Sequence, residues 1–202
     1  MREAPLARAA PGGRRRLSEV IDAAAKVFAQ RGYHGASTQD IADLLGMRQA
    51  SLYYYFDSKE AALEAVCRDG GEAYVERIDR IARGSAAASE KVAQVLFHHA
   101  APERLDFTLV FLRERRFLPQ PARRRIRAIE LRYERAIQRI IEAGIRAGEF
   151  RADLDARMAT LALLGLGSSA AVWYGREPGS TPERMLTAYV DLLVRALREA
   201  DA

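Results

Sequence analysis

The segment from Ser37 to Lys59 constrains the fold of this chain more than any other part of it. It opens with Ser-x-x-Asp, ending at Asp40, a pattern whose side chains satisfy free backbone N–H groups at a helix start. A short helix follows, and Gly46 can adopt the left-handed conformation that ends it. A second helix is expected from Gln49 to Tyr55. Two short helices joined by a glycine turn predict a helix-turn-helix, whose second helix enters a DNA major groove.

Apolar residues recur at three- and four-residue steps through most of the chain, and no segment shows the alternation typical of a strand. The first such helix carries Leu17 and is stopped by Gly32, and we expect it to pack on the helix-turn-helix. The expected fold class is therefore all-α, with about nine helices and no internal repeat. Further helices are expected to begin near Ser58, Ser89, Pro102, Ala122, Asp153 or Asp155, and Thr181.

Composition sets only broad limits on function. The chain has 202 residues, a net charge of +5 and a pI near 9.6, which permits a polyanionic partner without requiring one. No apolar region follows the basic N-terminal residues, so no signal peptide is expected. The uncharged run from Met158 to Gly175 is shorter than the about 20 residues of a membrane span, so it predicts a buried helix. Cys67, the single cysteine, excludes an internal disulfide. These features favour a cytoplasmic protein.

Several residues stand in an order and at a spacing that are typical of one family of regulators. They are Phe28, Gly32, Gly35, Thr38, Ile41-Ala42, Gly46, Leu52 to Phe56 and Ser58 to Glu60. In this order and spacing, the chain resembles the tetracycline-repressor (TetR) family of bacterial transcription regulators, most strongly from Arg14 to Tyr74. The second half resembles the family in helix count, in the turn Gly148 to Phe150 and in Trp173-Tyr174.

The resemblance implies a homodimer whose two recognition helices bind a palindromic operator in double-stranded DNA. It also implies a pocket for a small-molecule effector, whose binding moves a connecting helix and changes operator affinity. The expected division is a disordered arm over residues 1–13, a helix-turn-helix DNA-binding domain over 14–60, and an effector-binding and dimerisation domain over 61–202. The arm is either a simple tail or a basic segment that touches DNA phosphates. Most members of the family repress transcription, although an activator would carry the same DNA-binding residues.

The resemblance also implies which side chains contact DNA. Positions that usually contact phosphate or sugar in the family are occupied by Ser37, Thr38, Tyr53, Tyr54 and Lys59, and positions that often reach base edges or nearby phosphates by Arg48, Gln49 and Ser51. Tyr53 and Tyr54 point away from the apolar face of their helix, which favours the same interpretation, although packing inside the motif is the alternative. Arg48 stands where the family often has Ser or Thr, so the second helix is expected to lack a side-chain cap.

Aromatic residues of the second half are candidates for an effector pocket. The candidate ligand contacts are Phe97, His98, Phe107, Phe111, Tyr133, Trp173 and Tyr174. Ordinary core packing is the alternative for each of them. Arginines on both sides of Pro119 and Pro121 form either a solvated surface or a site for a phosphate-bearing effector. The second half is similar to family members that sense acyl-CoA thioesters, which favours an apolar ligand with phosphates.

The last two helices carry more apolar and small residues than one monomer needs for its core. The candidate dimer-interface residues are Leu161, Leu164, Ser168, Leu186, Tyr189 and Leu193. A four-helix interface between two copies follows, and twofold symmetry would set the recognition helices about 34–36 Å apart, one turn of DNA. The pair Gly70-Gly71 interrupts the long helix after Ser58, which indicates either close helix packing or a softened point in a connecting helix.

Catalysis and metal binding have little support in the sequence. No nucleophile–base grouping, glycine-rich phosphate loop or metal-ligand spacing occurs, and the adjacent pair His98-His99 diverges by about 100° on a helix. We therefore expect no cofactor, no metal and no enzymatic activity. A non-specific DNA-binding protein is the other alternative, and its binding would follow salt concentration with little sequence preference.

Overall fold

The computed structural model describes residues 13–99, 105–173, 179 and 181–198. Within these ranges the regular structure consists of nine α-helices and one short 3-10 helix, which confirms the all-α class. The helices are α1 (Gly13–Gly35), α2 (Thr38–Leu44), α3 (Gln49–Leu52), α4 (Lys59–Arg83), α5 (Ala88–His99), α6 (Leu105–Arg113), η2 (Arg115–Phe117), α7 (Gln120–Arg146), α8 (Ala156–Trp173) and α9 (Pro182–Leu197).

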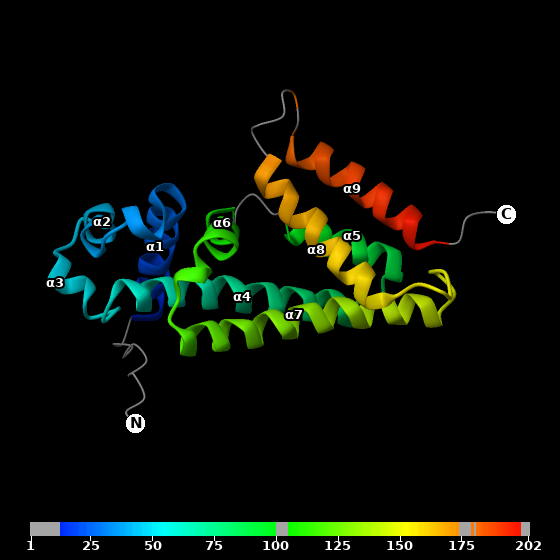
Figure 1. Cartoon of the computed structure of the whole chain (residues 1–202), viewed down its shortest axis with the longest axis horizontal. Coiled ribbons are helices and arrows are strands. Elements are labelled where there is room, and N and C mark those ends of the chain that lie inside the picture. Colours follow the sequence, from blue (N-terminus) through cyan, green and yellow to red (C-terminus); the bar gives the residue numbers. More distant parts are fainter. Residues whose placement is uncertain (1–12, 100–104, 174–178, 180, 199–202) are drawn as a thin grey trace.

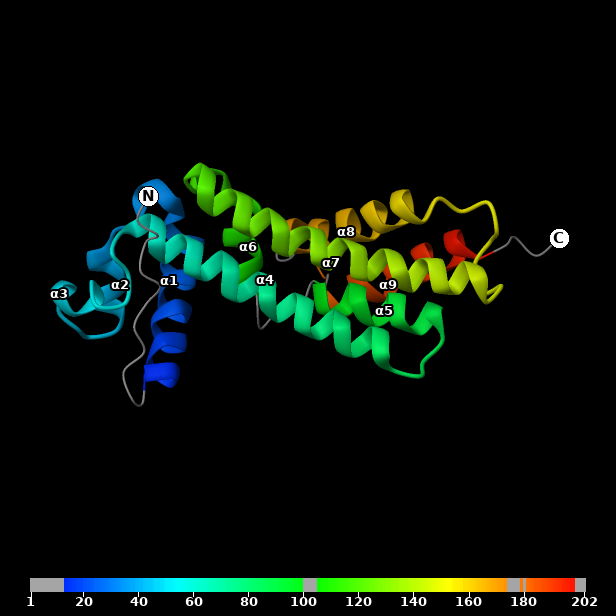
Figure 2. The same ribbon diagram turned by 90° about the horizontal axis from the view of Figure 1, so that it is seen from below.

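The two longest helices, α4 and α7, lie side by side along the long axis of the molecule (Figure 1). Helices α1 to α3 form one end, and α5, α8 and α9 gather at the other, with α6 between the two groups. The view from below shows the same arrangement (Figure 2). A Cβ atom added to Gly71 of α4 would lie 2.9 Å from Ile129 Cγ2 of α7, so the glycine allows close packing of the two helices. This contact supports the packing alternative for the Gly70-Gly71 pair.

A first hydrophobic core joins the helix-turn-helix to the middle of the chain. Phe28 of α1, Ile41 of α2, Leu52 of α3 and Leu63 of α4 are fully buried in it. The same cluster contains residues of α6, α7 and the segment between them: Phe107, Val110, Leu118, Ala122, Ile126 and Ile129. The DNA-binding end therefore shares its core with helices that come much later in the sequence.

A second core lies at the opposite end, between α4, α5, α7, α8 and α9. Leu96, Ile137, Ile141 and Leu163 are fully buried there. The described part of the uncharged run, residues 158–173, does not form a fully buried helix, because Met158, at 54% exposed, and other residues lie on an outer face of α8. The prediction was wrong on this point, since a helix without charges can still present one apolar face to solvent. None of the described helices has the length and hydrophobicity to cross a membrane.

The helix ends show where local sequence decides structure. Gly32 breaks the first helix with φ of 67°, as predicted, although a final turn continues to Gly35. Ser58 and Thr181 cap α4 and α9 as expected. The second helix of the motif is shorter than predicted: α3 ends at Leu52, and residues 53–55 form a turn. The predicted start at Pro102 lies outside the described residues.

The start of α5 is capped from a distance. Both backbone N–H groups of Ala88 and Ser89 donate to the carboxylate of Glu149, over 3.0 and 3.2 Å. These bonds, the one from Ala88 first, lower the pKa of Glu149. The turn after α7, where Gly148 has φ of 72°, thus supplies the cap for a helix 60 residues earlier. The sequence predicted the turn but not this contact.

Candidate functional site

The start of α2 is fixed by side chains of the helix-turn-helix itself. Ser37 Oγ accepts from the N–H of Asp40 over 3.1 Å, and Asp40 Oδ2 accepts from the N–H of Ser37 over 2.8 Å. Arg31 of α1 donates to the other oxygen of Asp40 over 2.6 Å. Hydrogen bonds from Ser37 lower the pKa of the half-buried Asp40 carboxyl. The predicted capping box is confirmed, and it also ties α2 to α1.

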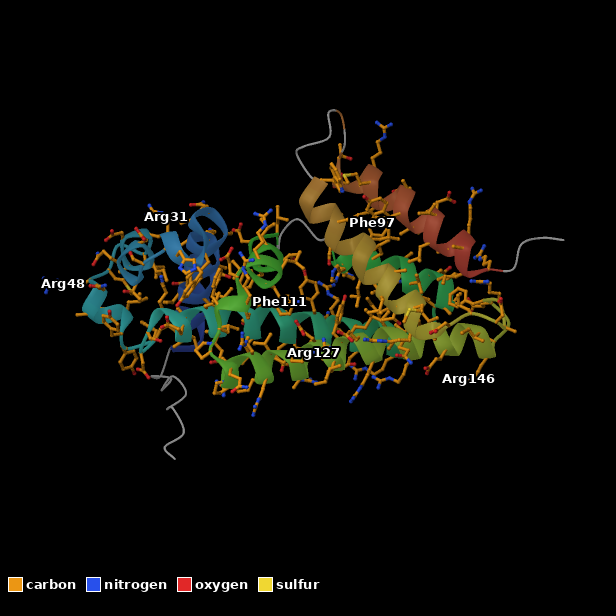
Figure 3. The ribbon with its side chains drawn as sticks, viewed as in Figure 1. Arg31, Arg48, Phe97, Phe111, Arg127 and Arg146 are labelled. Carbon is orange, nitrogen blue, oxygen red and sulfur yellow. The ribbon has the colours of Figure 1, made fainter. Side chains whose placement is uncertain are left out.

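The second helix of the motif begins without a side-chain cap. Arg48 occupies the cap position in an extended conformation and makes no capping hydrogen bond, as predicted. Burial of Leu52 and Phe56, which are 0% and 4% exposed, holds this short element instead. Arg48 is exposed and projects from the end of the molecule (Figure 3). Its guanidinium is therefore available to a partner.

The outward face of this element carries aromatic side chains. Tyr53 and Tyr54 are 47% and 56% exposed, and Ser51 beside them is also exposed. Tyr55 is half-buried and meets Tyr54 edge-on at 5.4 Å between ring centroids. Exposed aromatic side chains that lie together commonly mark an interaction site. Arg48, Ser51, Tyr53 and Tyr54 thus form a surface to which a partner can bind.

Three other predicted DNA contacts lie inside the motif. Thr38 is buried, and its Oγ1 accepts from Nε2 of the half-buried Gln49 over 2.8 Å. Lys59 Nζ donates to the carbonyl groups of Tyr33 and Ala36 over 2.9 and 3.1 Å and lies above the Tyr33 ring. Thr38 and Gln49 therefore join α2 to α3, and Lys59 closes the end of α1.

Tyr33, which no sequence pattern singled out, connects three parts of the molecule. Its hydroxyl donates to Glu60 at the start of α4. Its backbone N–H, freed by the break at Gly32, donates to Glu114 Oε2 over 2.8 Å, and its ring stacks on Phe117 at 5.2 Å. Burial first, and then Glu60, raise the pKa of Tyr33 to about 12. The sequence signal that could have pointed to Tyr33 is Gly32, the helix-breaking glycine directly before it.

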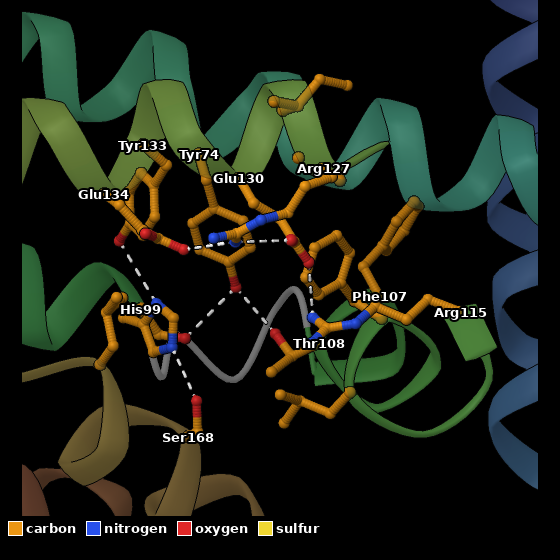
Figure 4. A pocket seen from close by; sticks show the side chains of 16 residues that line it. Tyr74, His99, Phe107, Thr108, Arg115, Arg127, Glu130, Tyr133, Glu134 and Ser168 are labelled. Carbon is orange, nitrogen blue, oxygen red and sulfur yellow. Dashed lines mark hydrogen bonds and ion pairs between the residues drawn. The ribbon is translucent and has the colours of Figure 1, made fainter. Parts of the chain in front are cut away.

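A cavity of about 230 Å³ lies between α4, α6, α7 and α8, with His99 of α5 at its border (Figure 4). Its apolar lining is Gly70, Gly71, Phe107, Phe111, Leu112, Ile129 and Leu164. Its neutral polar lining is Tyr74, His99, Thr108, Tyr133 and Ser168, and its charged lining is Arg115, Arg127, Glu130 and Glu134. A mainly apolar hollow with a few convergent polar groups is typical of a small-molecule site.

The cavity brings together part of the predicted effector contacts. Phe107, Phe111 and Tyr133 line it. Phe97 and Trp173, which are 39% and 49% exposed, are not among its described lining residues. His98 does not line it either, whereas its neighbour His99 does. Tyr174 lies outside the described residues. Adjacent residues of a helix point in different directions, so His98 and His99 cannot both face the cavity. The helical period does not show which of the two does.

His99 anchors a chain of polar groups inside the cavity. Its Nδ1 lies 3.3 Å from the Tyr133 hydroxyl, and its Nε2 lies 3.1 Å from Ser168 Oγ. Tyr74 is bonded to Thr108 over 2.7 Å and to the His99 carbonyl over 3.3 Å. Burial lowers the pKa of His99 to about 4, so the ring is neutral at physiological pH. Burial also raises the pKa of Tyr133.

Alternating charges line one side of the cavity. Arg115 and Arg127 bond to Glu130 over 2.7 and 3.0 Å, and Arg127 and Arg157 bond to Glu134, each over 2.7 Å. The arginine side chains are 38–50% exposed, whereas the two carboxylates are 11–13% exposed. Burial opposes the charge on Glu134, but the arginine hydrogen bonds outweigh it and lower its pKa. Arg115 and Arg127, which line the cavity, thus mark its mouth.

The arginines predicted on both sides of Pro119 and Pro121 are Arg113, Arg115, Arg116, Arg123, Arg124 and Arg125, and of these only Arg115 belongs to this mouth. Arg115 lines the cavity, and its guanidinium lies 4.8 Å from the Phe111 ring centroid. Arg125 instead bonds to Glu64 on α4 over 2.6 Å, and Arg123 and Arg124 are exposed on α7. Arg127 also lines the cavity, and Arg157 bonds to the lining residue Glu134 over 2.7 Å. No sequence pattern singled out either arginine. No local pattern distinguishes them from other charged residues on helix surfaces.

The predicted dimer residues divide between two faces of α8 and α9. Leu186 and Leu193 are 3% and 5% exposed and belong to the core of the monomer, so they leave little side-chain surface for a second copy. Leu164, Ser168 and Tyr189 are half-buried. The exposed apolar residues of these helices are Met158, Leu161, Trp173 and Leu192. This outer face, rather than the whole predicted set, is available to a second copy. Across the described ranges, no group of three or more His, Cys, Asp or Glu residues could hold a metal ion.

Comparisons with known proteins cover both halves of the chain. Residues 85–197 match the model described as "Tetracyclin repressor-like, C-terminal domain", and residues 20–66 match "Bacterial regulatory proteins, tetR family". The fatty acid metabolism regulator protein of Bacillus subtilis (strain 168) is 27% identical over 187 residues, which cover 91% of this chain and 96% of that protein.

Two crystal structures resemble the whole molecule. A tetR-family regulatory protein from Rhodococcus RHA1 superimposes with a TM-score of 0.81 at 27% identity, covering 92% of this chain and 98% of that one. The regulator FadR from Bacillus subtilis, solved in complex with stearoyl-CoA, superimposes with a TM-score of 0.75 at 26% identity, covering 90% of this chain and 99% of that one.

Proposed function

The chain belongs to the TetR family of bacterial regulators, and from this premise we propose that it is a repressor released from its operator by an acyl-CoA thioester. Ligand-responsive, DNA-binding regulation of transcription is the function of this family and of the relatives that the chain matches over nearly its full length. Regulators of this kind bind operator DNA as dimers. The effector class and the direction of control are the proposed part.

The observation that carries the effector class is an apolar cavity with arginines at its mouth. At about 230 Å³ the cavity is smaller than the roughly 300–1,000 Å³ of typical sites for whole ligands. It therefore suits the apolar end of a ligand whose larger polar part stays outside. Arg115 and Arg127 line the cavity with side chains that are 44% and 50% exposed, and guanidinium groups bind phosphates through paired hydrogen bonds. The stearoyl-CoA complex of FadR supports this ligand class.

The contacts around the cavity suggest how the ligand acts on DNA binding. Helix α6 supplies Phe107 and Phe111 to the cavity, and just after it Glu114 and Phe117 contact Tyr33 of α1. Helix α4 also lines the cavity and begins at Lys59, which closes the end of α1. A ligand that separates α6 from α4 would therefore rotate α1 and the helix-turn-helix. The ligand can shift the equilibrium between these two conformations only by as much as its affinities for them differ.

The DNA-binding end is proposed to use its exposed residues directly. Arg48, Ser51, Tyr53 and Tyr54 would meet the major groove and the phosphates beside it, and Ser37 lies at the adjacent N-terminus of α2. Thr38, Gln49 and Lys59 would act chiefly by holding these groups in place. A dimer through the outer face of α8 and α9 would present two such ends to a palindrome.

The division of the chain remains part of this proposal. Residues 14–60 would read DNA, residues 61–202 would bind the effector and the second copy, and residues 1–13 would be an arm. Because the proposed partner is the operator of a bacterial gene, the protein would act in the cytoplasm.

The test begins with selection of an operator from random DNA by the purified full chain. Octanoyl-CoA, stearoyl-CoA and free CoA are then titrated into the protein–operator complex, and release is followed by fluorescence anisotropy. We expect an acyl-CoA to release the operator and free CoA to be much weaker. Failure of every acyl-CoA to release DNA or to bind in calorimetry would exclude the proposed effector. DNA binding without a selected sequence would instead favour the non-specific alternative.

A matched pair of arginine variants tests the mouth of the cavity. Arg127→Ala removes a guanidinium that lines the cavity, and Arg124→Ala removes an exposed one on the same helix that does not. We expect Arg127→Ala to weaken acyl-CoA binding about 10-fold, the equivalent of about 1.4 kcal/mol, and Arg124→Ala to leave it unchanged. Operator affinity without ligand should stay the same in both. Equal affinities for acyl-CoA in the two variants would contradict a phosphate site at Arg127.

A further inference from the structure

From the polar chain inside the cavity we infer that the effector is recognised through a carbonyl oxygen, which accepts a hydrogen bond from either Tyr133 or Ser168. The inference rests on the proposed effector site and deepens it. It requires a hydrogen-bond acceptor in the apolar part of the ligand. The arginines at the mouth cannot impose this requirement. The three residues that carry it come from three different helices, α5, α7 and α8 (Figure 4).

The geometry forms a short linear chain with His99 in its middle. The Tyr133 hydroxyl lies 3.3 Å from His99 Nδ1, and Ser168 Oγ lies 3.1 Å from Nε2. All three side chains also line the cavity. Both ends of the chain are thus hydroxyl groups beside the space that a ligand would fill.

The ring of His99 has little freedom to turn. A Cβ atom added to Gly167 would lie 2.5 Å from His99 Cδ2, so the glycine leaves just enough room for the imidazole. The Tyr133 ring stacks on the other side with centroids 5.9 Å apart, and Tyr74 lies 5.7 Å away. The packing holds the plane of the ring, and the hydrogen bonds to Tyr133 and Ser168 set which nitrogen faces which hydroxyl.

A count of hydrogens shows what the chain offers to a ligand. Tyr133 and Ser168 each carry one hydroxyl hydrogen, and a neutral imidazole carries one ring hydrogen. The two bonds within the chain use two of these three hydrogens. Among the residues that the structure describes, neither hydroxyl has another acceptor within hydrogen-bonding geometry. One donor hydrogen therefore remains at an end of the chain, beside the cavity.

The tautomer of His99 decides which end keeps this hydrogen. If Nδ1 is protonated it donates to Tyr133, Ser168 donates to Nε2, and the Tyr133 hydrogen is left over. If Nε2 is protonated, the roles reverse and the Ser168 hydrogen is left over. In both cases the group offered is a donor without a partner. A buried donor without an acceptor is costly, so a ligand oxygen at this point is favoured over a methylene.

A carbonyl oxygen is the acceptor that matches this donor in an acyl thioester. It can come from the thioester itself or from an oxo group on the acyl chain. A group of the size of water occupies about 30 Å³. A cavity of about 230 Å³ therefore holds a chain of roughly eight such groups. Octanoyl compounds are therefore suitable probes of both sources.

The experiment compares three ligands by calorimetry: octanoyl-CoA, 3-oxooctanoyl-CoA and the octyl thioether of CoA, which lacks the thioester oxygen. If the oxo group is the acceptor, 3-oxooctanoyl-CoA should bind about 10-fold more tightly than octanoyl-CoA. If the thioester oxygen is the acceptor, the thioether should bind about 10-fold more weakly than octanoyl-CoA. Equal affinities for all three ligands would overturn the inference but leave the proposed effector class standing, whereas no binding of any of them would exclude that class.

Variants locate the donor. The double variant Tyr133→Phe/Ser168→Ala removes both hydroxyl hydrogens and leaves only the ring hydrogen of His99, so the 10-fold preference should disappear while octyl-thioether binding is kept. The single variants should show which end donates. Ser169→Ala is the matched control, because its hydroxyl donates to the Leu166 carbonyl and does not line the cavity. A preference that survives the double variant would overturn the inference. If the double variant does not fold, retention of the preference in both single variants would do so.

Discussion

Single residues show where a side chain's position depends on distant parts of the sequence. Ser37 and Asp40 are three residues apart, so their capping box could be predicted from the local pattern and is confirmed. Lys59 is different, because its ammonium group turns to the carbonyl groups of Tyr33 and Ala36, which no local pattern indicates. His99, rather than His98, faces the cavity for the same reason. The orientation of each helix about its axis is set by tertiary packing.

Because His99 is buried, the free energy of unfolding should depend on pH in a way that can be measured. Burial lowers its folded-state pKa to about 4, whereas an unfolded histidine titrates near 6.5. Between these values the unfolded chain binds the extra proton, so stability is full above pH 6.5 and is lost as pH falls towards 4. The expected loss is roughly 3 kcal/mol in the free energy of unfolding.

The measurement is urea denaturation at pH 7 and pH 4.5 for the native chain and for His99→Asn. Carboxylates with lowered pKa values, such as Asp40 and Glu149, destabilise both proteins on acidification. The difference between the two proteins therefore isolates the histidine. We expect the native chain to lose more stability than the variant by about 1–3 kcal/mol. Equal losses would mean that His99 is protonated in the folded protein.

At the scale of helices, the long amphipathic elements could be predicted and their partners could not. The extent of α7 was predicted to within two residues at its start, because its isoleucines repeat with helical period. The same periodicity says nothing of the bond from Tyr33 to Glu114, which lie 81 residues apart. Leu186 and Leu193 were predicted at the interface, but the buried stripe of α9 includes them and leaves Leu192 61% exposed. Neighbouring leucines differ only in which face the packing selects.

The contact between α6 and α1 predicts a variant that separates binding from response. Glu114→Ala removes the acceptor of the Tyr33 N–H. Operator and acyl-CoA should each still bind, but the ratio of operator affinities with and without ligand should fall at least 5-fold, in the range of ordinary allosteric coupling. Glu76→Ala, on an exposed part of α4, is the control. Anisotropy with and without ligand measures the ratio, and an unchanged ratio in Glu114→Ala would remove this contact from the mechanism.

At the scale of the whole molecule, α8 and α9 leave large apolar side chains exposed to solvent. Met158, Leu161 and Leu192 are 54%, 41% and 61% exposed. Apolar side chains gathered on one face commonly mark an interface between subunits. In the family to which the chain belongs, dimers bind the operator, and this face is available for that contact.

The dimer is tested by placing a charge on this face. Leu161→Asp should shift the sedimentation mass at micromolar concentration from dimer to monomer, because a carboxylate buried between two copies loses its hydration. Operator affinity should fall with it, since each monomer then contacts one half-site. Glu90→Asp, on the exposed side of α5, should change neither. A Leu161→Asp protein that remains dimeric would show that the copies meet elsewhere.

The shared first core has a consequence for how such a chain can be recombined. Residues of α6 and α7, among them Phe107 and Ile129, complete the core around Phe28 and Leu63. A chimaera cut at residue 60 would expose the apolar surface that these later helices cover. An exchange of sensor halves between relatives must therefore preserve the fit of α6 and α7 against α1 and α4. The same fit would also have limited which exchanges succeeded in natural recombination.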